Sequence, residues 1–203
     1  MKKILCYGDS NTFGYKPDDG GRYGKNSRWT GILQNKLGNN FEIIEEGMCD
    51  RTGFVDNPKG FIFSAQKHFP KLISSIDYVD IIILALGTND LQFQYDINNE
   101  TVENGLKILI NLAKEKSNEI ILVPPVILDE SILDGNFNYQ FDETSIKKSQ
   151  NAGEIYKRLA KTTNCKIFDF NEFVKPSKLD GLHYDEISHK LIAEKLVLYT
   201  FIC

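Results

Sequence analysis

This sequence of 203 residues has no hydrophobic run that approaches the roughly 18 residues needed to cross a bilayer. It also lacks an excess of charge of one sign, since 24 Lys and Arg stand against 28 Asp and Glu for a net charge of −4. Nothing in this balance favours binding to nucleic acid or to an anionic membrane. The apolar stretch after Met1-Lys2-Lys3 stops at Gly8, which is too soon for a signal peptide. We therefore expect a cytoplasmic protein without a nucleic-acid or membrane partner.

Cysteine is scarce, and its spacing carries no motif. The four cysteines are scattered without a CxxC pair, which argues against both disulfides and a zinc site. The sequence also lacks GxGxxG and GxxxxGK[ST], the glycine-rich loops that hold nucleotide phosphates. We therefore expect no metal and no cofactor. The cysteines are Cys6, Cys49, Cys165 and Cys203.

The remaining composition is that of one globular domain over residues 1–203, with 41% hydrophobic and 26% charged residues. Five short apolar segments read as strands, and amphipathic helical patterns lie between them. Segment 80–86 is apolar on both faces, as a central parallel strand is. This alternation predicts a three-layer α/β/α domain with right-handed crossovers. The predicted strands are residues 3–7, 41–45, 80–86, 119–123 and 165–170.

The last helical pattern and two long connections complete the predicted architecture. Ile192, Leu196 and Tyr199 recur at helical spacing, and Asp185 is placed to cap that helix. The long connections are residues 11–28 and 124–142, and both start from the carboxyl edge of the predicted sheet. Because long loops in compact domains are often functional, we expect these two to form the walls of a substrate pocket.

A serine stands directly after the first predicted strand. Ser10 therefore lies in a turn at the sheet edge where α/β proteins bind ligands, but its hydroxyl needs a base to become nucleophilic. Of the three histidines, His68 shares a helical face with apolar residues, and His189 is expected at a solvated position of the last helix. His183 lies in a loop-like stretch, and Asp180, three residues earlier, is placed to accept its Nδ1–H. The pattern predicts a nucleophile, a base and an orienting carboxylate.

Two further turns follow predicted strands at the same edge. Asn89, in Gly87-Thr88-Asn89-Asp90, could direct its side-chain amide at an oxyanion. Gly47, after the second strand, could offer an unobstructed backbone N–H. Both also have a plainer interpretation, because Gly, Asn and Asp favour turns that have no catalytic role.

Together these motifs resemble the four signature blocks of the SGNH (GDSL-type) hydrolases, in the family's order and over nearly the whole chain. The resemblance implies a flavodoxin-like fold with a five-stranded parallel sheet of strand order 2-1-3-4-5. It implies that Ser10 is the nucleophile, His183 the general base and Asp180 its orienter. It further implies an oxyanion hole formed by the Ser10 and Gly47 N–H groups and the Asn89 side chain. The blocks are Gly8-Asp9-Ser10-Asn11, Gly47, Gly87-Thr88-Asn89-Asp90 and Asp180-Gly181-Leu182-His183.

A narrower resemblance is to the bacterial arylesterase/acyltransferase subgroup, whose members often assemble, so a homo-oligomer is compatible with it. That subgroup usually has Asn-Gly where this chain has Cys49-Asp50. The arginines and the tryptophan in these motifs receive no catalytic role. An arginine near acidic loops is expected to pair with a carboxylate such as Asp9 or Asp50. The matching segments are Gly8-Asp9-Ser10-Asn11-Thr12-Phe13-Gly14-Tyr15, Arg28-Trp29, Glu45-Glu46-Gly47 and Arg51-Thr52.

The residues and the resemblance together predict a serine esterase that hydrolyses small acyl esters of the acetyl type through an acyl-enzyme. An acyltransferase that passes the acyl group to an alcohol would use the same residues. A second alternative is a flavodoxin-like module that binds an anion at the Ser10 turn without chemistry.

Overall fold

Five parallel strands form the centre of the structure, hydrogen-bonded in the order β2-β1-β3-β4-β5. The structure is a computed structural model and describes residues 1–202, so Cys203 lies outside the described residues. The predicted parallel sheet and its strand order are confirmed. The strands are β1 (Lys2–Gly8), β2 (Phe41–Gly47), β3 (Ile81–Ala85), β4 (Glu119–Val123) and β5 (Lys166–Ile167).

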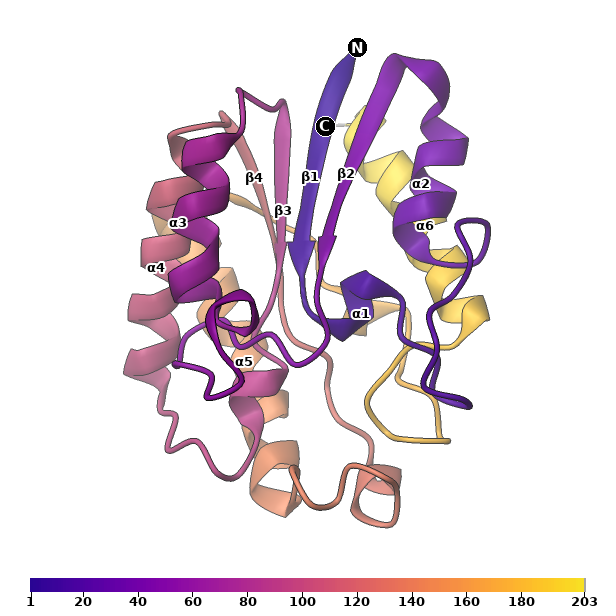
Figure 1. Cartoon of the computed structure of the whole chain (residues 1–203), viewed down its shortest axis with the longest axis vertical. Helices are drawn as coiled ribbons and strands as arrows, with labels where there is room; N and C mark the ends of the chain where they lie inside the picture. Colours follow the sequence, from indigo (N-terminus) through magenta and orange to yellow (C-terminus); the bar gives the residue numbers. More distant parts are fainter. Residues whose placement is uncertain (203) are drawn as a thin grey trace.

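Helices cover both faces of this sheet, which confirms the three layers. Figure 1 shows α3, α4 and α5 on one side and α2 and α6 on the other. The helices are α1 (Ser10–Phe13), α2 (Trp29–Leu37), α3 (Ala65–Ser75), α4 (Asn99–Lys114), α5 (Glu143–Thr163) and α6 (Glu186–Ile202). Short 3₁₀ helices are η1 (Gly38–Asn40), η2 (Phe61–Phe63), η3 (Asn89–Leu91), η4 (Glu130–Leu133) and η5 (Phe170–Glu172).

The core is double because β1 is buried on both faces. Ile4 and Cys6 pack in the cluster with α2 and α6, whereas Leu5 and Tyr7 pack in the cluster with α3, α4 and α5. This alternation follows from the two-residue repeat of a strand. It explains why the first and third strands read as continuous apolar runs in the sequence.

The structure confirms the predicted start of α6 and shortens the predicted fifth strand. Asp185 Oδ1 accepts the backbone N–H of Ser188 at 2.8 Å, so the predicted cap of α6 is confirmed. The fifth strand, predicted over residues 165–170, is present but shorter: it spans Lys166–Ile167, and the Phe168 N–H still donates to the Leu122 carbonyl at 2.9 Å. The Asp169 side chain accepts the N–H of Asn171 at 3.0 Å and thereby starts η5.

His189 was expected at a solvated position of the last helix, and this expectation was wrong. The side chain is fully buried, and its Nδ1 accepts the backbone N–H of Trp29 at the start of α2 at 3.3 Å. The rings of Tyr23 and Tyr184 pack edge-on against the imidazole at 5.2 and 6.2 Å between centroids. The packing of α6 on α2 therefore removes this histidine from water.

The structure gives two further findings on the described residues. Cys6, Cys49 and Cys165 carry free thiols. Within residues 1–202, no helix has the length and apolar character required to cross a membrane.

The burial of His189 predicts a pH dependence of stability. Burial lowers the pKa of His189 to about 3, with Asp185 opposing and His183 adding to the shift. The unfolded chain binds the proton near pH 6.5, so the free energy of unfolding falls as the pH falls from 6.5 towards 3. Between pH 7.5 and pH 5 this histidine should remove about 2 kcal/mol of stability.

Urea unfolding at these two pH values measures the loss. His189→Asn is the matched variant, because it keeps an acceptor for the Trp29 N–H and removes the titrating ring. Its loss of stability over the same pH range should be smaller than that of the unsubstituted protein by about 2 kcal/mol. Equal losses in the two proteins would contradict the prediction.

Candidate active site

The predicted site residues meet where the carboxyl ends of three neighbouring strands lie side by side. β1 pairs with β2 on one side and with β3 on the other, which makes its end a topological switch point. Ser10 follows β1, Gly47 ends β2, and Asn89 begins η3 after β3. The strand order therefore sets Ser10 between the other two, and Figure 1 shows α1, which begins at Ser10, beside the ends of β1 and β2.

Ser10 is the first residue of α1 rather than part of an open turn. Asp9 caps this helix, its Oδ1 accepting the N–H of Asn11 at 3.0 Å. The turn from β1 into α1 requires glycine at position 8. A Cβ there would lie 2.1 Å from Thr12 Oγ1 and 2.6 Å from the carbonyl oxygen of Ala85. The tight turn leaves the Ser10 side chain at the sheet edge, directed at the loop before α6.

His183 and Asp180 occupy that loop and meet Ser10 across 173 positions of sequence. His183 Nε2 lies 2.9 Å from Ser10 Oγ, and His183 Nδ1 lies 2.6 Å from Asp180 Oδ2. The other carboxylate oxygen, Oδ1, accepts the backbone N–H groups of Leu182 and His183 at 2.9 Å each. Because a carboxylate oxygen faces Nδ1, Nδ1 carries the hydrogen and Nε2 is left to accept the serine proton. The structure thus brings the predicted nucleophile, base and orienting carboxylate together.

Aromatic rings from the two long connections pack against the imidazole. Tyr15, in the connection after α1, packs on His183 at 4.1 Å between ring centroids, and Phe137, in the connection after β4, packs edge-on at 5.3 Å. Both connections therefore contact the site, as the sequence predicted for its walls. In the sequence, Tyr15 lies in the segment that resembles the arylesterase/acyltransferase subgroup, but no role was predicted for it. Phe137 lies in a segment without periodicity, and no sequence signal identified it.

Asn11 fixes the backbone on each side of His183. Its Nδ2 donates to the Leu182 carbonyl at 3.2 Å, and its Oδ1 accepts the N–H of Tyr184 at 3.1 Å. Its own carbonyl accepts the indole N–H of Trp29 at 3.1 Å. The sequence showed Asn11 as part of the Gly8-Asp9-Ser10-Asn11 motif but did not predict this role. Its position directly after Ser10 was the available signal.

The two further residues of the predicted oxyanion hole are held by close packing and by hydrogen bonds. Gly47 lies in register with Gly8, and a Cβ on Gly47 would lie 2.2 Å from the Phe13 nitrogen of α1, so only glycine fits. The buried Asn89 donates from Nδ2 to the Arg51 carbonyl at 3.1 Å. The same nitrogen carries a second hydrogen.

Two buried carboxylates support these turns. Burial raises the pKa of Asp9, and the Thr88 hydroxyl and the Asn11 N–H oppose that rise. Burial also raises the pKa of Asp90 to about 6, although the backbone N–H groups of residues 53–55 donate to it at 2.6 to 3.0 Å. Asp90 thereby ties the segment after β2 to η3, beside Asn89.

The arginines were expected to pair with Asp9 or Asp50, and their partners are different. Arg28 does bind a carboxylate, but it is that of Glu45, with Nε–Oε1 at 2.9 Å and Nη2–Oε2 at 2.6 Å. Arg51 binds backbone carbonyl groups instead. The expectation for Arg51 was wrong because its guanidinium donates to carbonyl groups at the strand ends, while the Asp9 carboxylate caps α1 and the Asp50 carboxylate pairs with Lys59.

The Cys49-Asp50 departure from the resembled subgroup has a structural consequence. Asp50 has a φ of 61°, in the left-handed region that glycine adopts without strain, and the subgroup usually has glycine there. Its carboxylate pairs with Lys59 Nζ at 2.8 Å. Burial, with Asp50 and Asp9 adding to it, raises the pKa of the Cys49 thiol to about 11. This thiol is therefore protonated near neutral pH.

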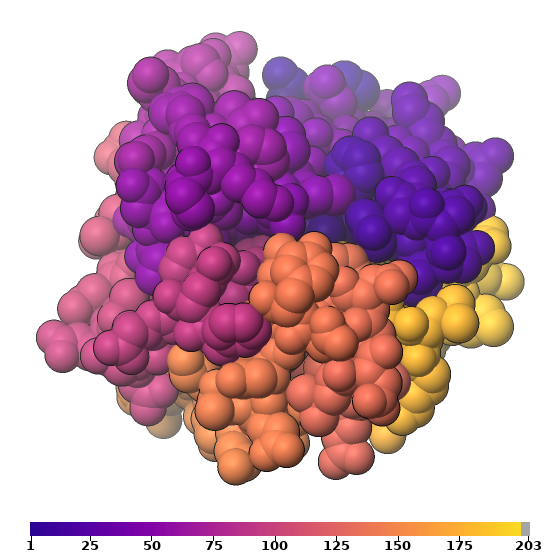
Figure 2. Space-filling model, turned by 60° about the horizontal axis from the view of Figure 1, so that its bottom comes forward, coloured from indigo at the N-terminus to yellow at the C-terminus, as the bar shows by residue number. Residues whose placement is uncertain are grey.

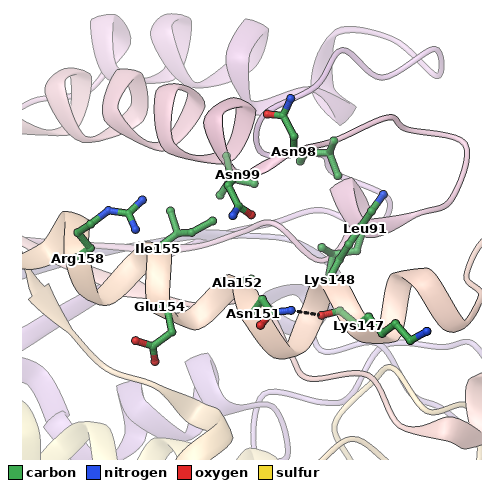
Figure 3. Close-up of a pocket in the computed structure, with 12 residues that line it drawn as sticks. Leu91, Asn98, Asn99, Lys147, Lys148, Asn151, Ala152, Glu154, Ile155 and Arg158 are labelled. Atoms are coloured by element: carbon green, nitrogen blue, oxygen red, sulfur yellow. Dashed lines mark hydrogen bonds between the residues drawn. The ribbon is translucent and has the colours of Figure 1, made fainter.

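The surface around the site joins segments that are far apart in sequence. Figure 2 looks at the lower end of the molecule, where the indigo N-terminal connection, the purple segment after β2 and the orange segment after β4 meet. A separate hollow lies between the start of α4 and α5 (Figure 3) and contains none of the predicted site residues. Its Arg158 pairs with Glu103 at 2.6 Å. Within residues 1–202, no three His, Cys, Asp or Glu side chains are grouped to hold a metal ion.

Comparisons with known proteins identify the family and the fold of this chain. The profile of the GDSL-like Lipase/Acylhydrolase family matches residues 6–191. An inhibitor-bound aryl esterase from M. smegmatis is 26% identical with a TM-score of 0.90, and the match covers 98% of each chain. A carbohydrate acetylesterase from Sinorhizobium meliloti is 25% identical with a TM-score of 0.91, over 100% of this chain and 99% of the other. Curated protein sequences gave no match.

The left-handed backbone at Asp50 predicts an order of stability between two variants. Asp50→Gly and Asp50→Ala both lose the ion pair with Lys59, but only alanine keeps a Cβ at a φ of 61°. The glycine variant should therefore be more stable than the alanine variant by about 1 kcal/mol. Urea unfolding of the two proteins under one condition measures the difference, and a more stable alanine variant would refute the prediction.

Proposed function

This chain belongs to the GDSL-like lipase/acylhydrolase family and is a carboxylic ester hydrolase, and from this we propose that it cleaves small acyl esters of the acetyl type with Ser10 as nucleophile. The observation that carries the proposal is the continuous hydrogen-bonded line from Ser10 Oγ through His183 to Asp180, at 2.9 and 2.6 Å. All three side chains are at least 95% buried, so these interactions are little weakened by water.

In the first half of the proposed reaction, Ser10 Oγ attacks the ester carbonyl carbon while its proton passes to His183 Nε2. The carbonyl oxygen becomes an oxyanion, stabilised by the N–H groups of Ser10 and Gly47 and by the Asn89 amide. The C–O bond to the alcohol then breaks, and the leaving alkoxide takes the proton from Nε2. An acyl group remains on Ser10 Oγ.

In the second half, water attacks the acyl carbon and gives its proton to His183 Nε2. Collapse of the second oxyanion breaks the bond to Ser10 Oγ, which recovers the proton, and the acid is released. Asp180 keeps the hydrogen on Nδ1 and stabilises the imidazolium in both halves. An alcohol in place of water would complete an acyl transfer with the same residues, and product analysis with a competing alcohol separates the two outcomes.

Two observations support a small acyl group and a small-molecule substrate. Relatives of similar structure act as an aryl esterase and as a carbohydrate acetylesterase. The Tyr15 and Phe137 rings also pack against His183 and against each other, which limits the room on that side of the imidazole. We expect p-nitrophenyl acetate to be turned over faster than esters of long-chain acids, which a panel of increasing acyl length measures.

The nucleophile is tested by Ser10→Ala. Turnover of p-nitrophenyl acetate should fall by roughly three orders of magnitude or more, because only binding and oxyanion stabilisation remain. Ser64→Ala is the matched control, since Ser64 is also a buried serine but its hydroxyl has no hydrogen-bond partner among the described residues. That control should keep full activity. Retention of most activity by Ser10→Ala would remove Ser10 from the mechanism.

The oxyanion role of Asn89 is tested by Asn89→Ala. The kcat should fall by roughly 10²–10³-fold, because the amide donates to a charge that develops only after attack. The KM should change little, since the ground-state carbonyl carries less charge. Measurement of kcat per folded molecule, with folding checked by circular dichroism, separates this role from a merely structural one.

Asn171→Ala is the control for Asn89. Asn171 also ties loop backbone, accepting the Ile127 N–H at 2.8 Å and donating to the Pro125 carbonyl at 3.0 Å. Its loss should lower stability and leave kcat per folded molecule unchanged. An unchanged kcat in well-folded Asn89→Ala protein would defeat the oxyanion assignment.

A further inference from the structure

A buried arginine without a carboxylate partner lies beneath the site. The Arg51 side chain is 1% exposed, and within residues 1–202 no carboxylate lies within ion-pair distance of it. Burial lowers the pKa of Arg51, yet a guanidinium stays charged near neutral pH. Backbone carbonyl oxygens and the Tyr7 ring, whose centroid lies 4.3 Å from Cζ, face its charge directly, and the Glu46 and Asp9 carboxylates act on it from beyond ion-pair distance. Such a costly buried charge calls for a reason.

The carbonyl groups that Arg51 binds belong to the strand ends of the site. Nη1 donates to the Gly8 carbonyl at 3.0 Å, at the end of β1, and also to the Glu46 carbonyl. The Glu46 carbonyl and the Gly47 N–H are the two ends of one peptide group. Nε donates to the Ile62 carbonyl at 3.2 Å and so secures the guanidinium from the other side.

The backbone of Arg51 contacts the third strand end as well. Its carbonyl accepts Asn89 Nδ2 at 3.1 Å, which fixes the direction of that amide. Asp90 holds the N–H groups of residues 53–55, so the segment that carries Arg51 is tied to η3 at two points. Arg51 therefore contacts the ends of β1 and β2 through its side chain and η3 through its backbone carbonyl.

We propose that Arg51 is the positioning residue of the oxyanion hole. This proposal rests on the proposed function of Ser10, Gly47 and Asn89. The cation lies at the oxygen end of the Glu46–Gly47 peptide group, so it polarises that group and strengthens its N–H as a donor. The effect is larger for an oxyanion than for a neutral carbonyl, because the donor faces full negative charge only after attack. Arg51 touches no reacting atom and acts through Gly47 and Asn89.

A purely structural role makes a different prediction. Arg51 donates to three carbonyl groups, of which that of Gly8 also accepts the Met48 N–H at 3.2 Å, so its loss removes several hydrogen bonds and lowers stability in either case. A structural role would lower the rates of all substrates in proportion to the folded fraction. A role in the oxyanion hole lowers the rate most where the developing charge lies on oxygen.

The experiment compares p-nitrophenyl acetate with its thiono analogue, in which sulfur replaces the carbonyl oxygen. Sulfur is a weak hydrogen-bond acceptor, so the thiono ester gains little from the oxyanion hole. Arg51→Lys keeps the charge but not the fork that reaches several carbonyls. We expect kcat for the oxygen ester to fall roughly tenfold or more with little change in KM, and the ratio of oxygen-ester to thiono-ester rates to fall several-fold.

Arg28→Lys is the matched control. Arg28 is also a buried arginine beside β2, but it binds the Glu45 side chain rather than the peptide before Gly47. It should lose stability and keep the unsubstituted ratio. If Arg51→Lys does not fold, Arg51→Gln carries the same test, because it retains N–H donors without the charge and should also lower the ratio.

The failure of this proposal is distinguishable from failure of the proposed function. If the unsubstituted protein does not hydrolyse esters, or Ser10→Ala remains active, then the proposed function itself is wrong and the role of Arg51 in it falls with it. If hydrolysis depends on Ser10 and folded Arg51→Lys keeps the unsubstituted rate ratio, only the role of Arg51 is overturned. If the oxygen-ester and thiono-ester rates of Arg51→Lys fall by the same factor, the role of Arg51 is likewise overturned.

Discussion

The parallel pairing of β1 with β2 and β3 is the constraint on which the rest of the site depends. In this register Gly8 lies beside Gly47 on one side and beside Ala85 on the other, so three strands end at one level. Ser10 and Asn89 lie in the short, tightly turned segments that follow β1 and β3, and Gly47 is itself the last residue of β2. The apolar faces of β1 fix that register, because a shift by one residue would exchange the two halves of the core.

The polar groups at this edge are buried, and backbone atoms satisfy them. Asp9 and Asp90 accept backbone N–H groups, whereas Arg51 donates to backbone carbonyl groups. Charges held by fixed backbone dipoles keep their positions while a reaction proceeds, which is the condition for electrostatic stabilisation of a transition state. The same hydrogen bonds also hold the loops together, so they contribute both to stability and to the geometry of the site.

The imidazole depends on a different kind of support. The Asp180 loop reaches the site from near the far end of the chain, and the Asn11 side chain secures the backbone on both sides of His183. The connection after β4 adds a hydrogen bond from the Asp129 N–H to the Gly181 carbonyl at 2.9 Å. The Tyr15 and Phe137 rings, from the two long connections, then restrict rotation of the imidazole. The base is therefore positioned by segments that meet only in the folded chain.

The sequence by itself determined the architecture and the members of the site, because strand runs, helical periodicity and short motifs are local patterns. It predicted the sheet, its order through the family resemblance, and the residues that the structure brings together around Ser10. It did not determine the burial of His189 or the contact of Arg51 with the end of β1, since both depend on atoms distant in sequence, and it did not show that the Asp169 side chain starts η5 where the predicted fifth strand was to continue. His189 is buried because α2 packs on α6, and Arg51 meets backbone carbonyls that have no side-chain signature. Local periodicity is set by neighbouring residues, whereas burial and charge pairing are set by tertiary packing, and only the structure shows those.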